Sequence, residues 1–182
     1  IQISGDVNMD ASLDVMDIVI IVEYVLGNSN FTDQQLDISD MSNDGTVNVI
    51  DIVEIVSEIL NMPLLRANGL NEATLIYGNG EFLIHYSDVI AGMQCELSGE
   101  FIITDEFLPV GWYVEKSNET LLLYNLNGSN LDIEKLFNYE GDVVIHSCMA
   151  TDWTFVPLYL DIVLLPEEFV LSPAYPNPFN PT

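Results

Sequence analysis

Basic residues are almost missing from this chain. Against 29 Asp and Glu it has three Lys and Arg, so its 182 residues carry a formal net charge of −26. The basic residues are Arg66, Lys116 and Lys135. A surface of this sign repels phosphate groups, which excludes nucleic acid and anionic membrane surfaces as electrostatic partners.

Long apolar runs and cysteines are scarce as well. No run reaches the roughly 18 apolar residues of a membrane span. The two cysteines, Cys95 and Cys148, form no CxxC or Cys/His pattern, so the sequence gives no sign of redox or nucleophilic chemistry. They are either a disulfide, in an oxidising compartment, or two small buried thiols. The hydrophobic content of 49% is nevertheless enough for real cores.

Oxygen-bearing side chains recur in a loop that occurs twice. Residues 6–17 carry them at loop positions 1, 3, 5, 9 and 12, and residues 40–51 repeat the pattern and the apolar run after it. Alternate positions of an EF-hand-type loop supply six to eight oxygens to calcium, a hard cation. We therefore predict two Ca²⁺ sites, with Ser12 and Thr46 binding through their carbonyls. The donors are Asp6, Asn8, Asp10, Ser12, Asp14 and Asp17 in the first site, and Asp40, Ser42, Asp44, Thr46, Asn48 and Asp51 in the second.

The alternative is that these Asp and Asn residues only form turns and helix caps. Two loops in register, each followed by a helical pattern, favour calcium. Position 6 differs between the repeats: its sharp turn normally demands Gly, which Gly45 supplies, whereas the first loop has Ala11. The first site is therefore expected to be the weaker one.

The first third of the chain resembles a dockerin, the duplicated calcium-binding module that docks onto cohesin domains in bacterial extracellular assemblies. The resemblance covers about residues 5–62 and rests on Gly5-Asp6-Val7-Asn8, on Asp at position 12 of both loops, and on the absence of a preceding helix. It implies a cohesin-like partner, in the same chain, in another copy or in another protein. It also implies binding through loop positions 10 and 11, which are Val15-Met16 and Val49-Ile50, and through the helices that follow.

Two helices follow the loops, at about residues 15–26 and 51–60. Ile18, Ile21, Val22 and Val25 have the spacing of a buried stripe. The other face of this first helix is also apolar, so we expect it to be covered on more than one side. The second helix carries Glu54, Ser57 and Glu58 opposite its apolar stripe and is expected to be solvated. The predicted partner-binding residues are Val15, Met16, Val19, Ile20, Tyr24, Val49 and Ile50.

From about residue 73 the periodicity changes to that of strands. Eight are expected, at residues 73–77, 81–86, 90–97, 100–104, 111–115, 120–126, 142–148 and 158–165, with a short helical crossing at 132–137. Short strands with this punctuation predict an antiparallel β-sandwich. Val89–Leu97 resembles a strand of cohesin-like modules, although a generic sandwich strand explains it too. The fold class is then α+β, an all-α module before a cohesin-like or jelly-roll sandwich.

The end of the chain is punctuated by proline. Pro176-Asn177-Pro178-Phe179-Asn180-Pro181-Thr182 resembles the opening of the C-terminal sorting domain of bacterial type IX secretion substrates, which implies export and cell-surface attachment or release. We predict a dockerin-like domain at 1–64, a sandwich at 65–168 and a sorting segment at 169–182.

Catalytic patterns are weak. His85 and His146 each lie in a strand, and no HExxH, GxSxG or P-loop motif occurs. We predict a non-catalytic, extracellular, calcium-dependent assembly or adhesion protein that folds back on itself or forms filaments or surface arrays. The alternative is a carbohydrate-binding module, or the non-catalytic end of a secreted glycan-degrading enzyme. The aromatic residues that could stack on sugars are Trp112, Tyr113, Tyr124 and Trp153.

Overall fold

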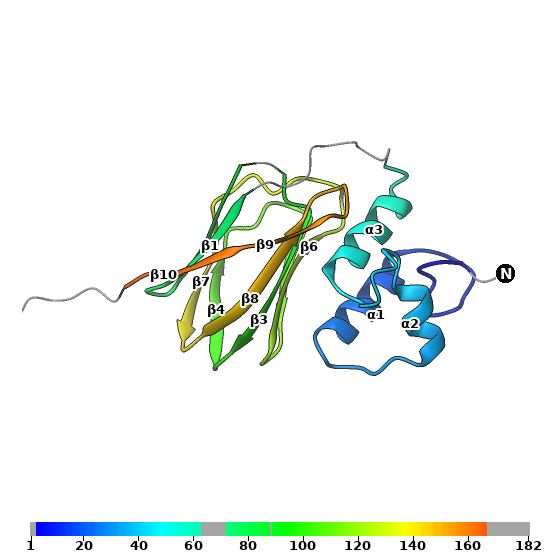
Figure 1. The fold of residues 1–182 in the computed structure, drawn as a ribbon, viewed down its shortest axis with the longest axis horizontal. Helices are drawn as coiled ribbons and strands as arrows, with labels where there is room; N and C mark the ends of the chain where they lie inside the picture. Colours follow the sequence, from blue (N-terminus) through cyan, green and yellow to red (C-terminus); the bar gives the residue numbers. More distant parts are fainter. Residues whose placement is uncertain (1–2, 63–71, 88, 167–182) are drawn as a thin grey trace, which may run out of the picture.

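A group of helices lies beside a two-layered β-structure in the computed structural model (Figure 1). The structure describes residues 3–62, 72–87 and 89–166. None of the described helices is long and apolar enough to cross a membrane. The predicted sorting segment at 169–182 lies outside the described residues.

The helical part contains α1 (Val15–Val25), α2 (Asp33–Ser39) and α3 (Val49–Ile59). Each of the two long helices begins directly in a calcium-type loop. Asp14 caps α1 and Asn48 caps α3, and in both helices the Asp at the third position bonds back to the cap. These reciprocal bonds satisfy amides that a helix start leaves free. The loop and the helix start are therefore one structural unit in each repeat.

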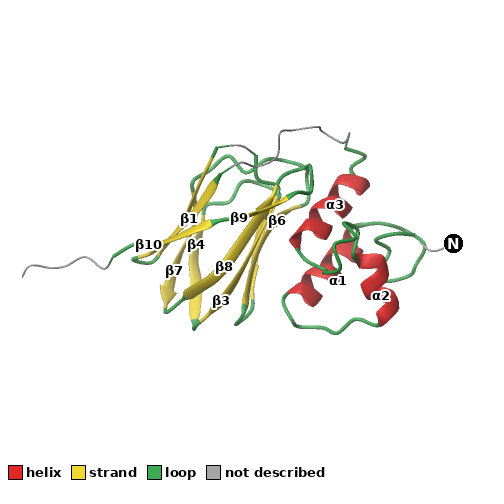
Figure 2. Cartoon of the chain, viewed as in Figure 1, coloured by secondary structure: helices red, strands yellow, loops and turns green. Residues whose placement is uncertain are grey.

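In the described residues, ten strands form two five-stranded sheets (Figure 2). One sheet has the order β10-β1-β2-β7-β4 and the other β5-β6-β3-β8-β9. All pairs are antiparallel except β1 with β10, which is parallel. The strands are β1 (Ala73–Gly78), β2 (Glu81–Tyr86), β3 (Gly92–Ser98), β4 (Phe101–Glu106), β5 (Trp112–Lys116), β6 (Thr120–Asn125), β7 (Lys135–Gly141), β8 (Val144–Thr151), β9 (Pro157–Tyr159) and β10 (Asp161–Leu164). The predicted α+β class with a sandwich is confirmed.

Two predictions about single elements were wrong. The expected helical crossing at 132–137 gives way to β7, which pairs with β2 on one side and with β4 on the other. The expected strand at 158–165 is two strands in different sheets, because the chain crosses over at Leu160. Leu160 is buried, and its amide donates to the Cys148 carbonyl at 2.8 Å.

The sandwich core lies between the two sheets and is rich in aromatic and aliphatic side chains. Phe82 stacks on Phe137 with ring centroids 4.6 Å apart. Cys95 and Cys148 face each other on β3 and β8 and are joined by a disulfide within this core.

A second core joins the helices to the sandwich. It combines apolar residues of α1 and α3 with Ala91, Leu122, Tyr124 and Trp153. Helix α3 packs against α1 and against β6, β3 and β8 (Figure 1). The prediction that the first helix is covered and the second solvated was wrong, because α3 lies in this contact while α1 leaves Val19 45% exposed.

Candidate calcium loops and docking faces

The first position of each loop organises the turn. The Asp6 carboxylate accepts hydrogen bonds from the Asp10 amide at 3.1 Å and the Ala11 amide at 2.9 Å. In the second loop Asp40 accepts from Asp44 at 3.1 Å and from Gly45 at 2.9 Å. Two sequences that differ at most positions therefore fold into the same loop, with the position-1 carboxylate at its centre.

The last position of each loop is a buried carboxylate. Asp17 accepts from the Val7 amide at 2.9 Å and the Asp14 amide at 3.0 Å. Asp51 repeats this with the Ser42 amide at 3.0 Å and the Asn48 amide at 2.8 Å. Both side chains are fully shielded from solvent.

Burial raises the pKa of Asp51, and the nearby charge of Asp40 raises it further, although amide hydrogen bonds oppose the shift. A buried anion is costly unless a cation or hydrogen bonds compensate it. The amides of the loop meet part of that requirement. A bound cation would meet the rest.

The described part of the chain brings no basic side chain to the loops. Its two lysines contact sandwich residues: Lys135 pairs with Glu81, and Lys116 lies 4.6 Å from the Phe101 ring centroid. No three His, Cys, Asp or Glu side chains within residues 3–62, 72–87 and 89–166 already converge as a ligand set. The predicted shells also use Asn, Ser and carbonyl oxygens. Hard oxygen donors without His or Cys fit Ca²⁺ rather than a softer metal.

Loop position 6 requires a left-handed backbone in both repeats. Gly45 has φ of 90° and Ala11 has φ of 70°. A non-glycine residue in this region costs about 1–2 kcal/mol, partly offset by the greater freedom that glycine loses on folding. The first loop is therefore strained where the second is not.

We expect Ala11→Gly to tighten calcium binding at the first loop about threefold to fivefold, equivalent to about 1 kcal/mol. Gly45→Ala is the matched reverse change and should weaken the second loop by a similar factor. A Cβ at Gly45 would meet nothing within 4 Å, so only backbone strain acts there. Calorimetric titration of each variant measures the effect. Unchanged affinity in both would show that position 6 does not limit binding.

The two predicted docking faces have opposite environments. Val15, Met16 and Val19 of α1 are 46%, 54% and 45% exposed. Their counterparts in the second repeat, Val49, Ile50 and Val53, are 0%, 2% and 1% exposed. Of the other predicted partner-binding residues, Ile20 packs at the edge of the second core and Tyr24 stacks on Phe31. The two repeats are similar in sequence, but the equivalent residues differ in burial because the sandwich covers α3.

The outer face of the β5-β6-β3-β8-β9 sheet receives α3. The Val49 amide donates to Gln94 Oε1 at 3.0 Å, which satisfies one of the free amides at the helix start. A side chain at Gly92 would place its Cβ 2.7 Å from a Val53 methyl and 2.8 Å from a Val49 methyl. Ile50 lines a hollow together with Gln94, Met149 and Tyr159. Gly92 and Gln94 thus form the surface on which α3 packs, and the sequence pattern did not predict this role for them.

Acidic groups crowd one side of this contact. Partial burial raises the pKa of Glu115 on β5, and so do the charges of Glu23 on α1 and Glu106. Burial, followed by the charge of Glu115, raises the pKa of Tyr124 to about 12. The Tyr124 hydroxyl therefore stays neutral at the module contact.

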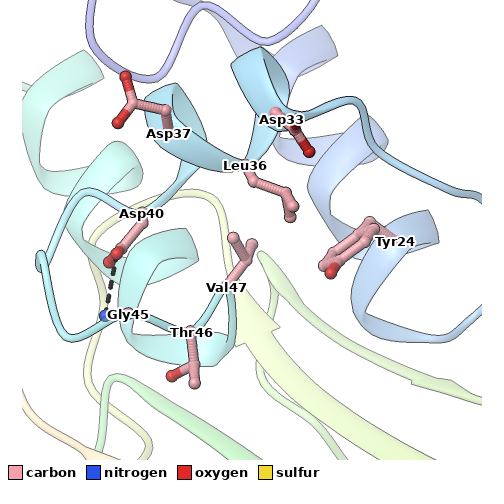
Figure 3. A pocket seen from close by; sticks show the side chains of 8 residues that line it. All are labelled: Tyr24, Asp33, Leu36, Asp37, Asp40, Gly45, Thr46 and Val47. Carbon is pink, nitrogen blue, oxygen red and sulfur yellow. Dashed lines mark hydrogen bonds between the residues drawn. The ribbon is translucent and has the colours of Figure 1, made fainter.

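A hollow of about 510 Å³ lies between α1, α2 and the second loop. In Figure 3, Tyr24, Leu36 and Val47 point toward one another from these three elements, and the Asp40 carboxylate turns to the Gly45 amide. Asp33 and Asp37 also line the hollow from α2. The hollow is therefore lined both by α2, which lies between the two repeats, and by the second loop, which holds Asp40.

The histidines do not form a site together. His146 lies 2.9 Å from Ser98 Oγ, and exposed His85 lies 3.8 Å from Glu134. Of the four aromatic residues considered for sugar stacking, Trp112, Tyr124 and Trp153 are buried and Tyr113 is 45% exposed. Buried rings cannot offer a face to a sugar, so they do not build the predicted stacking platform.

Among the comparisons with known proteins, the family match lies in the helical part of the chain. No curated protein matches the chain. A solved structure, the cohesin module of a family 33 glycoside hydrolase from Clostridium perfringens ATCC13124, is similar with a TM-score of 0.30 and 10% identity, over 54% of this chain and 100% of that one. The family model of the dockerin type I domain, a calcium-binding domain of protein–protein assemblies, matches residues 4–60, which hold both loops and the three helices of the described part of the chain.

Proposed function

We propose that the protein is a non-catalytic assembly module whose dockerin-like part is organised by two calcium ions. The observation that carries this proposal is the repeated loop: the same carboxylate-to-amide bonds occur in both copies, and each ends in a buried Asp. Calcium supplies the positive charge that the described residues around the loops lack. The donor residues predicted from the sequence would hold it.

The docking surfaces are the faces that begin at loop positions 10 and 11. Calcium shapes the loop, the loop places the cap, and the cap starts the helix that carries the face. Binding of metal and exposure of a correctly shaped docking face are therefore coupled. We place this function outside the cell, where calcium is available at the concentrations that extracellular modules use. The resemblance of residues 176–182 to a type IX sorting sequence supports the same location.

The test is a calorimetric titration with Ca²⁺. We expect two sites in the natural protein, one in Asp6→Ala/Asp10→Ala and one in Asp40→Ala/Asp44→Ala. The matched control is Asp33→Ala/Asp37→Ala, which removes two α2 carboxylates outside the loops and should retain both sites. If the loop variants bind as much calcium as the control, the loops are not the sites and the proposal fails.

A further inference from the structure

The geometry points to the chain's own sandwich as the partner of the α3 docking face, so that the protein is closed in cis rather than linked head to tail with other copies. This inference rests on the proposed function, because it names the partner of one of its docking faces. It concerns the outer surface of the β5-β6-β3-β8-β9 sheet, centred on Gly92 and Gln94.

The first support is the completeness of the contact. Val49, Ile50 and Val53 are each at most 2% exposed, although Val49 and Ile50 occupy the loop positions at which dockerin-like docking is expected. On the sheet side, Leu122 and Tyr124 are buried on the outer face of β6. A face buried to this degree on both sides is not available to a second molecule.

The second support is polar matching. The Val49 amide is free at the helix start and finds its acceptor, Gln94 Oε1, on the sandwich. The Asn125 side chain donates to the Ala91 carbonyl at 2.9 Å, and the Ala91 amide donates to Thr151 at 2.8 Å, which fixes the strand entry beneath α3. Buried polar groups are therefore paired across and beneath the contact, as a specific interface requires.

The third support is steric. Gly92 brings the sheet backbone close enough that the methyl groups of Val49 and Val53 lie where any side chain would begin. Its own φ lies outside the left-handed region, so the strand does not need glycine for its backbone conformation. Glycine at this position serves the approach of the helix.

Charge and connectivity favour the closed form over a chain of copies. Molecules with a net charge of −26 repel one another, whereas a contact within one chain adds no such repulsion between copies. Two modules on one chain also meet at an effective concentration in the millimolar range and avoid most of the association cost.

The experiment uses the full chain with calcium and compares three variants. Gly92→Leu places a side chain under α3, and Val53→Glu buries a charge at the same contact. Val19→Glu is the matched control, since Val19 is the repeat counterpart of Val53 and lies exposed. Small-angle scattering measures the radius of gyration, which is about 16 Å for one compact body of this length. Light scattering measures the molar mass, and the emission of Trp153 in the contact reports opening.

We expect a monomer whose molar mass does not change with concentration. Gly92→Leu should increase the radius by several ångström and shift the Trp153 emission to the red, while Val19→Glu should change neither. Under conditions in which Val53→Glu is folded, it should show the same increase in radius and the same red shift as Gly92→Leu. Trp112, which lies in the sandwich core, provides an internal reference once Trp153→Phe is used to separate the two signals.

Two results would overturn the inference. One is an unchanged radius and emission in Gly92→Leu. The other is a natural protein whose mass grows with concentration and returns to that of a monomer in Gly92→Leu, which would place the contact between copies. Calcium titration distinguishes a failure of this inference from a failure of the proposed function. Gly92→Leu should still bind two calcium ions, because only the contact between the modules is opened. A natural protein that binds no calcium would contradict the proposed function and would leave the contact in cis unaffected.

Discussion

Removal of calcium is expected to unfold residues 4–60 and to leave the sandwich folded. Four carboxylates of the first loop and three of the second then repel one another, and Asp17 and Asp51 remain as buried anions. Each site filled at a hundredfold excess over its Kd contributes about 2.7 kcal/mol. Two such contributions match or exceed the roughly 3–5 kcal/mol that a core of this size supplies.

Far-UV circular dichroism with calcium and with chelator measures this effect. The helical signal should fall on chelation, and the strand signal and the emission of Trp112 should stay. The matched control is magnesium at equal concentration, because Mg²⁺ dehydrates reluctantly and prefers near-ideal octahedral sites. An identical melting curve with and without chelator would contradict a structural role for calcium.

Loss of the helices should also expose the sheet they cover. Leu122 and Tyr124 are buried in the core that β6 shares with α1 and α3. An apolar patch of this kind on a solvated sheet promotes association. Calcium-free protein is therefore expected to be less soluble than the calcium form, even though the sandwich itself remains folded.

The turns of the two candidate calcium loops and the start of each helix could be predicted from local sequence. The spacing of Asp and Asn determines which amides each carboxylate can reach, and the same residues cap the helices. Asp14 and Asn48, predicted as loop donors, also appear as N-caps. Such short-range bonds depend little on the rest of the fold, so the pattern is informative by itself.

The burial of the helices could not be predicted from the helices alone. Glu54, Ser57 and Glu58 suggested a solvated face on α3, yet Ser57 is 7% exposed and Glu54 is only partly exposed. The sequence signal for this burial lies in β6, the strand against which α3 packs. Residues 121–124 are four consecutive apolar residues, and a strand with this pattern is covered on both faces.

The two misassigned segments have physical reasons as well. Residues 132–137 enter β7 through an irregular register opposite β2, where Leu136 and Phe137 are both fully buried, and this breaks the alternation that marks a strand. Residues 158–165 are apolar apart from Asp161, but the buried Leu160 is the point at which the chain leaves one sheet for the other.

Breaking the bond between Cys95 and Cys148 is expected to destabilise the sandwich by about 4 kcal/mol on the chain-entropy model, because the bond closes a loop with a sequence separation of 53. Both residues lie in the core on neighbouring strands, so Cys95→Ala/Cys148→Ala also loses a small packing contribution. Chemical denaturation of the sandwich, followed by Trp112 emission, measures the loss. The midpoint should fall, and the slope with denaturant should rise somewhat, because the unfolded chain is less compact without the cross-link.

Reduced natural protein is the control that separates the two causes. It keeps both sulfur atoms in the core, so its loss of stability reports the covalent link alone, and the Ala/Ala variant should lie slightly below it. Calcium binding should be the same in all three forms, since the loops fold from local bonds in the other module. Equal denaturation midpoints for oxidised and reduced protein would show that the disulfide does not stabilise the sandwich. Two reduced cysteines in the core would then give the same stability.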